Sequence, residues 1–184
     1  MSHNPPSPHG QPRAGLLRRL AALFYDALLL VAVLLIAGAL TLPFTQGEAV
    51  EPGNPFFRTY LFMVAFFFFA WFWTHGGQTL GMRAWRLRVQ QRSGGGLSWW
   101  HALLRFLSAL PAWFILFAAI ESTAPRPEAA TGLLGLLHAI PTPVLFTVGT
   151  LLLLWDHSPW SWRDRFSETE VVRLPKHLPR RPDA

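Results

Sequence analysis

Four long apolar runs alternate with polar segments along the chain, and this alternation is the main structural signal in the sequence. A transmembrane helix needs about 20 predominantly apolar residues. The pattern therefore predicts an all-α membrane protein with four transmembrane helices in a bundle and a short polar loop between the second and third helices. The expected spans lie at about residues 20–42, 57–74, 101–120 and 132–155.

The first apolar run opens with Arg18 and Arg19 and carries one acidic residue, Asp26. A positive flank before an apolar run is also typical of a secretory signal peptide, but the apolar region of a cleaved signal has only about 7–15 residues. Because this run is longer and contains an acid, we expect a retained first transmembrane helix.

The segment between the second and third runs, residues 76–100, is polar and basic. Leu87 and Val89 alternate with polar residues and are followed by the glycines Gly94–Gly96, which predicts a short β-hairpin or lip on the membrane surface. Arg105 lies near the start of the third run, and we expect its side chain to snorkel towards the interface.

Basic residues gather before the first run, between the second and third, and after the fourth, whereas the two other loops carry more glutamates than arginines. Cytoplasmic loops of membrane proteins are enriched in Lys and Arg. We therefore expect both termini and the central loop to lie in the cytoplasm.

The composition agrees with a membrane protein, because only 14% of residues are charged against about 25% in a typical soluble domain. The sequence pI near 11.2 also suits a nucleic-acid-binding protein. However, the basic residues flank apolar runs, so we expect no nucleic acid as partner and instead contact of cytoplasmic arginines with the bilayer and its anionic lipids. The chain has no cysteine, HExxH or Ser/His/Asp pattern, so we expect no enzyme, cofactor or metal site.

The two ends of the chain differ in composition from the apolar domain, which we place at residues 13–173. Residues 1–12 contain Pro, Ser and His without periodicity and are expected to form a disordered tail. Residues 174–184 are expected to form a basic tail.

Asp26 is the first candidate functional residue. An acid at the centre of an inserted helix costs about 2.5–3.5 kcal/mol, and such residues usually face the bundle interior and have a partner there. Arg19 lies seven residues earlier, on nearly the same helical face. Two interpretations remain open: a carboxylate that takes part in transport, and a structural acid that holds the helices together.

Three stretches of the chain together resemble the RDD family of small bacterial membrane proteins: RRLAALFYD, GGQTLGMRAWRLRV and WRDRFSETEVV. The family is named for one arginine and two aspartates, which correspond to Arg19, Asp26 and Asp164, and Thr169 matches its threonine. The chain departs from the family pattern at Arg163, where histidine is usual, and also at Phe166, Ser167 and Glu168.

The resemblance implies a multi-pass protein of the bacterial inner membrane with a role in transport of an unknown ligand or in cation/proton exchange. We expect Asp164, in a Trp-rich segment after the fourth run, to lie at the bundle mouth and to meet Asp26 with Arg19 between them. The alternative is that Asp164 forms a solvated charge cluster with Arg163 and Arg165. Secondary candidates for the site are Arg105, His138, Asp156 and Thr169.

His138 lies inside the fourth run and suits either a proton shuttle or a hydrogen-bonded packing residue. Four helices are few for a translocation path, so a transporter implies a homo-oligomer. The other function held open is a non-transporting scaffold or assembly protein that binds anionic lipid or a partner through its basic cytoplasmic face.

Overall fold

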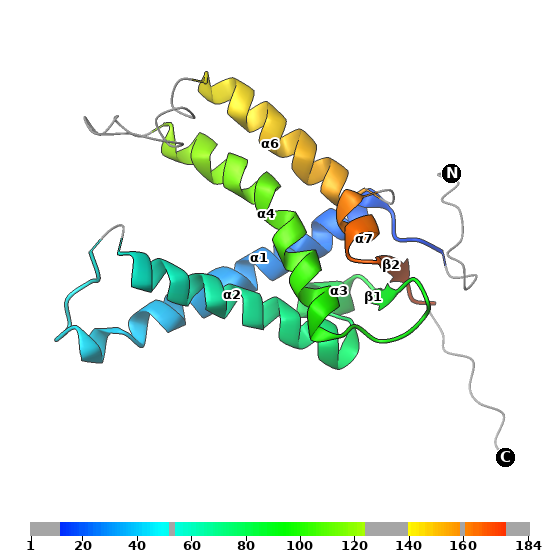
Figure 1. Cartoon of the computed structure of the whole chain (residues 1–184), viewed down its shortest axis with the longest axis horizontal. Coiled ribbons are helices and arrows are strands. Elements are labelled where there is room, and N and C mark those ends of the chain that lie inside the picture. The colour runs from blue at the N-terminus through cyan, green and yellow to red at the C-terminus, as the bar shows by residue number, and fades with distance from the viewer. Residues whose placement is uncertain (1–11, 52–53, 124–139, 159–160, 176–184) are drawn as a thin grey trace, which may run out of the picture.

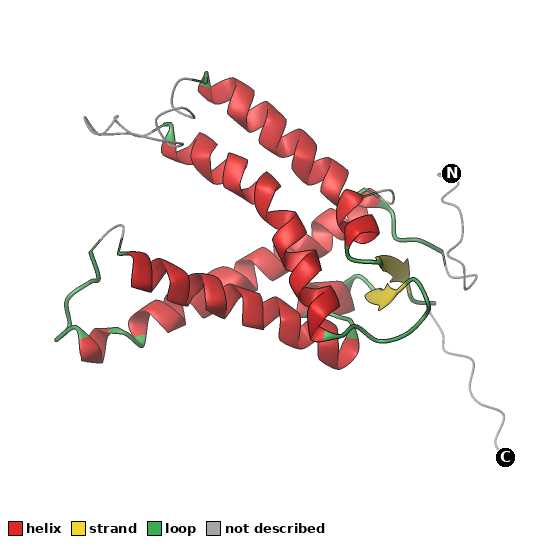
Figure 2. Ribbon diagram, viewed as in Figure 1, coloured by secondary structure: helices red, strands yellow, loops and turns green. Residues whose placement is uncertain are grey.

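The computed structural model describes residues 12–51, 54–123, 140–158 and 161–175. Long helices dominate it, with one small sheet at the end where α7 and both strands lie (Figures 1 and 2). The elements are α1 (Leu16–Ala39), the 3-10 helix η1 (Leu42–Phe44), α2 (Pro55–Gly76), α3 (Leu80–Ala84), β1 (Leu87–Gln91), α4 (Trp99–Glu121), α6 (Thr142–Asp156), α7 (Trp162–Phe166) and β2 (Thr169–Arg173).

Three stretches of helix are long and apolar enough to cross a membrane: α1 together with η1, α2, and α4. Their bounds agree with the first three predicted spans to within a few residues at each end. Helices α2 and α4 begin after Asn54 and Ser98, whose side-chain oxygens accept hydrogen bonds from backbone N–H groups of the first turn. Such N-caps satisfy donors that have no partner within the helix.

The fourth predicted span is only partly described. Residues 132–139 of that span lie outside the described residues, and α6 begins at Thr142, directly after Pro141. The described helix has 15 residues, which is shorter than the roughly 20 needed to cross a bilayer. The structure thus supports three membrane-length helices and one shorter apolar helix.

The helices form two hairpins rather than a parallel-sided bundle. Helix α1 packs against α2, and α4 packs most extensively against α6; the two hairpins diverge from the end that carries the sheet (Figure 1). Near that end α4 also contacts α2, where Phe106 lies edge-on to Phe62 and Phe66 with ring centroids 5.3 Å apart. Apolar runs predict helices, but they do not determine which helical faces meet.

The sheet has two antiparallel strands and pairs Leu87 with Arg173 at one end and Gln91 with Thr169 at the other. The prediction of an all-α protein therefore requires a correction, because a two-stranded sheet is present. The prediction of a local β-hairpin after Leu87 and Val89 also requires one. The alternating residues do form a strand, but Gly94–Gly96 lead into α4, and the partner strand β2 comes from the far end of the sequence. A local alternation identifies a strand and carries no information about a distant partner.

Three distant segments meet at the sheet. Ala14 donates its backbone N–H to the carbonyl of Val171 at 3.0 Å, and Leu174 donates to the carbonyl of Arg86 at 2.8 Å. The hydrophobic core cluster of buried residues includes Leu87 and Val89 of this sheet. By contrast, the long helices expose many large apolar side chains, as expected of surfaces that contact lipid, among them Leu35, Phe56 and Leu151.

Candidate functional site

The first part of the site is a buried carboxylate bound by two arginines. Asp164 lies in α7, where its backbone N–H donates to the N-cap Ser161 Oγ at 3.1 Å. Arg19 of α1 donates from Nη1 to Asp164 Oδ2 at 2.7 Å, and Arg105 of α4 donates from Nη1 to Oδ1 at 2.5 Å. One carboxylate therefore joins α1, α4 and α7.

Arg105 has further partners on the same side. Its Nη1 also donates to Thr169 Oγ1 at 2.7 Å, and its guanidinium lies over the Trp73 ring, 5.5 Å from the centroid. Only 2% of Arg105 is exposed, so the prediction that it snorkels to the interface is wrong. Its guanidinium turns inward because Asp164 offers a charged acceptor there. The two secondary candidates Arg105 and Thr169 thus share one hydrogen-bonded cluster.

The electrostatics of Asp164 follow from two opposing effects. Burial raises the pKa of this carboxyl, but the positive charges of Arg105 and Arg19 outweigh burial and hold the pKa well below its usual range. The carboxylate therefore stays ionised at physiological pH. The interpretation of Asp164 as a solvated charge cluster with its neighbours does not fit its burial, although Arg165 is exposed.

The second part of the site surrounds Asp26. Its Oδ1 accepts from the backbone N–H of Gly81 at 2.8 Å, and its Oδ2 accepts from Thr79 Oγ1. Thr79 is also the N-cap of α3, where its Oγ1 accepts from Met82 N at 3.2 Å. The turn Thr79–Gly81 therefore docks on α1 through the Asp26 carboxylate.

Gly81 permits this close approach. A Cβ at position 81 would overlap the carbonyl oxygen of Ala22 and lie 2.8 Å from Asp26 Oδ1. The three residues expected to cluster are thus divided: Arg19 pairs with Asp164, whereas Asp26 binds the turn before α3. The hydrogen bonds of Arg19 go to Asp164 and to the carbonyls of Ala14 and Val171.

A third charged pair lies beside the first two. Arg163 Nη1 lies 3.1 Å from Asp156 Oδ2, and the neighbouring His157 donates from Nδ1 to the carbonyl of Leu153 at 2.9 Å. Burial lowers the pKa of His157 to about 3 and that of Arg163 to about 10. His157 is therefore neutral at physiological pH, while Arg163 remains charged.

Sequence reasoning included Asp156 among the secondary candidates but did not identify His157, and it noted Arg163 as a departure from the family pattern and as part of a possible solvated charge cluster. His157 directly follows Asp156, so adjacency to an acid at the end of an apolar run is a usable signal. His138, the proton-shuttle candidate, lies outside the described residues.

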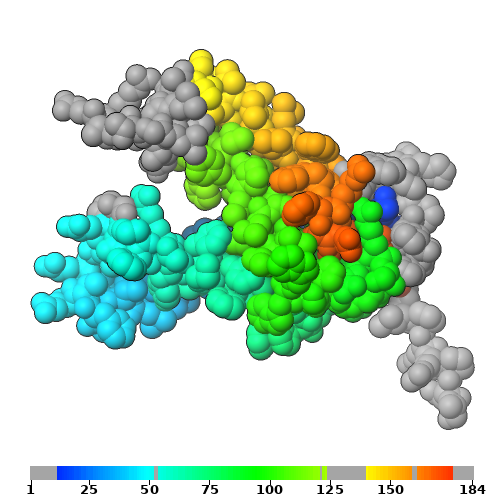
Figure 3. Space-filling view, viewed as in Figure 1, coloured from blue at the N-terminus to red at the C-terminus, as the bar shows by residue number. Residues whose placement is uncertain are grey.

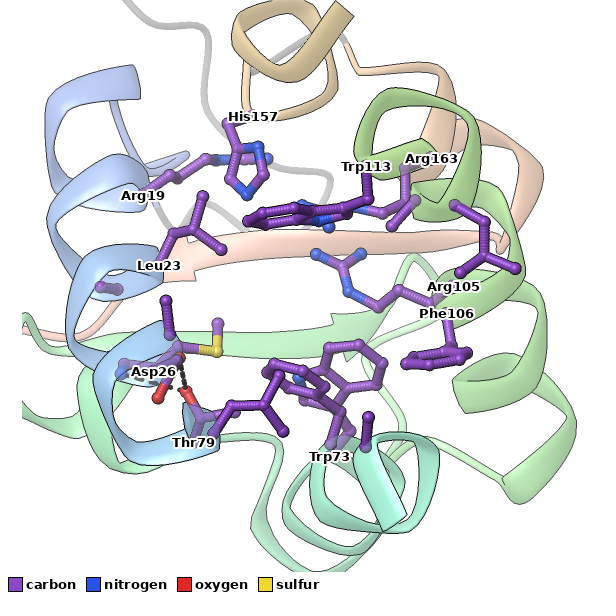
Figure 4. Close-up of a pocket in the computed structure, with 18 of the residues that line it drawn as sticks. Arg19, Leu23, Asp26, Trp73, Thr79, Arg105, Phe106, Trp113, His157 and Arg163 are labelled. Carbon is purple, nitrogen blue, oxygen red and sulfur yellow. Dashed lines mark hydrogen bonds between the residues drawn. The ribbon is translucent and has the colours of Figure 1, made fainter. Parts of the chain in front are cut away.

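A cavity of about 420 Å³ is lined by side chains from all three parts of the site. Its volume lies within the range of about 300–1,000 Å³ typical of ligand pockets. It lies between α1, α2 and α4, in the hollow visible between the two hairpins (Figure 3). Its inner end carries charged and polar groups (Figure 4), and its walls are apolar. The polar lining residues are Arg19, Asp26, Thr79, Arg105, His157 and Arg163.

Asp26 is the one carboxylate in this lining, and neither Asp156 nor Asp164 reaches it. Within the described part of the chain, His and acidic residues form no group of three that could hold a metal ion. The cavity thus combines arginine donors, one carboxylate and a long apolar wall.

Comparison with known proteins gives one match. The sequence model of the RDD family matches residues 13–168, which is most of the chain. No curated protein and no solved structure matches it. The family match and three apolar helices of membrane-spanning length indicate a membrane protein, and the chain belongs to the RDD family.

Proposed function

We propose that this protein moves a small ligand in exchange with protons, with the cavity as binding site and Asp26 as the proton-exchanging group. One observation carries the proposal: an apolar cavity between membrane-length helices ends on a single carboxylate, that of Asp26. Intramembrane acids usually face a bundle interior or a water-filled cavity and mark proton or substrate pathways.

Asp26 suits proton exchange better than Asp164. Two arginines neutralise Asp164, so protonating it would leave buried positive charge without compensation. Asp26 instead accepts hydrogen bonds from two neutral donors, Thr79 and Gly81, and it forms no ion pair within the described residues. A carboxylate with neutral partners is free of this penalty and can both gain and lose a proton.

The sign of charge in the cavity bears on the ligand. Three arginines and one aspartate line the cavity, which disfavours a metal cation there and favours an anion. We therefore expect the proton to be the exchanged cation. This charge distribution favours transport of a small ligand coupled to protons over exchange of a metal cation for protons.

The test is proton flux in proteoliposomes. Purified protein is reconstituted with a trapped pH-sensitive dye, and gradients of pH, of a small anion such as acetate or phosphate, or of Na⁺ or K⁺ are imposed. We expect Asp26→Asn to lower the flux at least tenfold, whereas Glu48→Gln, which removes an exposed carboxylate from the loop at the opposite end, leaves it at the wild-type rate. Equal flux in wild type and Asp26→Asn under every gradient would sink the proposal.

A second function, a non-transporting scaffold, is favoured by the same hydrogen bonds. Asp26 ties α1 to α3 through Thr79 and Gly81, which is a structural task. The neighbouring segment exposes several arginines that suit an anionic lipid surface or an acidic partner: Arg83, Arg86 and Arg88. On this function Asp26→Asn lowers protein abundance and thermal stability, and no proton flux depends on it.

We propose further that the end with the sheet faces the cytoplasm of a bacterial inner membrane, because the arginine-rich segments gather there. The chain has no cysteine, so single cysteines report orientation cleanly. Ser93→Cys should react with an impermeant maleimide only from the cytoplasmic side, and Glu48→Cys only from the outside. The reverse pattern would exclude this orientation.

We also expect a homo-oligomer, and crosslinking in native membrane tests this expectation. Recovery of the monomer alone would contradict it.

A further inference from the structure

Two buried arginines, Arg105 and Arg163, lie at the inner end of the cavity and hold hydrogen-bond donors that have no partner among the described residues. The Nε atoms of Arg105 and Arg163 are fully buried and have no partner among the described residues, and both side chains line the cavity. Only 2% of Arg105 and 8% of Arg163 are exposed. Both Nε atoms are covered by protein, so an anion in the cavity would meet the outer nitrogens of these guanidinium groups, each of which carries two N–H donors.

The charge at this end is not balanced within the cluster. Arg19 and Arg105 share the single carboxylate of Asp164, which leaves one positive charge in excess. Arg163 is paired with Asp156 and is therefore neutral as a pair. Asp26 is the one carboxylate of the cavity lining; when Asp26 is protonated, one negative charge on a ligand compensates the excess.

The wall of the cavity is apolar and extends from the charged end into the membrane part of the helices. On α4 the lining runs from Arg105 to Phe117, about 18 Å at 1.5 Å per residue. At the far end Val31 and Phe117 line the cavity and are also 55% and 60% exposed. The cavity therefore opens sideways, between α1 and α4, towards the hydrocarbon of the bilayer.

We propose that this cavity binds one anionic phospholipid, with its phosphate at the guanidinium groups of Arg105 and Arg163 and one acyl chain along α4 towards Phe117. Charge-assisted hydrogen bonds between guanidinium and phosphate are short and strong. Trp113 also lines the cavity, and in Figure 4 its ring is drawn between His157 and Arg105.

The apolar wall selects a lipid rather than a free phosphate. A free anion would leave the wall without a partner, whereas an acyl chain fills it with methylene groups from the adjacent bilayer. The proposed site is also distinct from the exposed arginines near β1, which attract any anionic surface without enclosing a headgroup.

The test measures lipid retained by the purified full-length protein in detergent, by native mass spectrometry. The probes are palmitoyl-oleoyl phosphatidylglycerol and the phosphatidylcholine with the same chains. We expect at least tenfold more bound phosphatidylglycerol at equal lipid concentration. Glycerol 1-phosphate, which has the headgroup charge without acyl chains, should not displace it. Equal binding of the two lipids, or displacement by glycerol 1-phosphate, would overturn the proposal.

Two variants locate the site. Ala109→Phe places a ring in the cavity and removes no charged group, since Ala109 lines the apolar wall, and should lower retention of phosphatidylglycerol at least tenfold. Its control is Ala32→Phe, which adds the same ring to an exposed position of α1 outside the cavity and should retain lipid like wild type. A folded Ala109→Phe protein with wild-type retention contradicts the site.

Arg163→Gln tests the headgroup contact separately. It should reduce the preference for phosphatidylglycerol over phosphatidylcholine at least threefold, and thermal unfolding shows whether the variant folds. An unchanged preference in folded Arg163→Gln rules out this contact, and Ala109→Phe still decides the site if the arginine variant does not fold. The proposal uses the cavity of the proposed transport function. Lipid retention is measured without flux, and proton flux is measured without lipid analysis. The lipid proposal and the transport proposal can therefore be contradicted independently.

Discussion

Arg19 Nη1 lies 2.7 Å from Asp164 Oδ2, and this buried ion pair joins the first membrane helix to a short helix near the other end of the sequence. Arg19 and Asp164, which the resemblance matched to the arginine and the second aspartate of the family's name, therefore bind each other. Because Arg105 binds the other carboxylate oxygen at 2.5 Å, a single acid holds both helical hairpins to α7. The three-way contact lies at the end from which the hairpins diverge (Figure 1).

Asp164→Asn should strongly destabilise the protein. The amide keeps the shape of the side chain but leaves Arg19 and Arg105 buried without a counter-charge, and breaking a buried ion pair in this way costs about 3–5 kcal/mol. Thermal unfolding in mild detergent measures the loss. Glu168→Gln, which removes an exposed carboxylate four residues later, is the matched control and should unfold like wild type; comparable midpoints for the two variants would contradict a role for Asp164.

Gly81→Ala should separate α3 from α1. The added methyl group would overlap the carbonyl oxygen of Ala22 and press on the Asp26 carboxylate, and overpacking of this kind costs about 1–3 kcal/mol. Gly96→Ala is the control, since a Cβ at Gly96 would meet nothing within 4 Å. We expect a lower unfolding midpoint for Gly81→Ala alone, and an unaltered midpoint would show that the turn has room to move.

The sequence identified the apolar helices and the principal charged residues because those signals are local. An unbroken apolar run indicates a membrane helix whatever it packs against, and an acid such as Asp26 stands out inside it. Of the four predicted membrane helices, three have membrane length in the described structure and nearly the predicted bounds. The family pattern singled out Arg19 and Asp164, which the structure places in contact.

The partners of these residues could not be read from the sequence, because each partner is distant along the chain. Thr79 is an ordinary polar residue until the fold places its hydroxyl against Asp26. Arg105 suggested snorkelling because nothing near it in sequence offers a buried acceptor. The pairing of β1 with β2 likewise depends on α7 returning the chain to the sheet, which no local alternation encodes.

The hydrogen bond between Thr79 and Asp26 should appear as coupling between two substitutions. Thr79→Val removes the hydroxyl donor and Asp26→Asn removes the carboxylate charge, so the loss from both together should be smaller than the sum of the single losses. We expect a coupling of about 1–3 kcal/mol from unfolding of the four proteins of the double-mutant cycle. The same cycle with Glu168→Gln in place of Asp26→Asn should be additive, and additivity in both cycles would mean that the hydrogen bond contributes nothing.

Burial of neutral His157 should make stability fall as the pH is lowered. The folded protein takes up this proton only near the pKa of about 3, whereas the unfolded chain takes it up near 6.5, so the unfolded state holds more protons in between. The free energy of unfolding therefore decreases from about pH 6.5 downwards, by at most about 1.4 kcal/mol per pH unit. Asp164 acts in the same direction, but only below its ordinary pKa of 3.8.

Thermal unfolding in detergent between pH 7.5 and 5 isolates the contribution of His157 from that of Asp164. His157→Gln does not titrate, and its amide can still donate to the carbonyl of Leu153, so it should lose less stability than wild type over this interval. Equal pH dependence in the two proteins would show that His157 is protonated, or reached by water, in the folded state. The wild-type protein should thus be the more acid-sensitive of the two, because its buried imidazole must remain neutral beside the positive charge of Arg163.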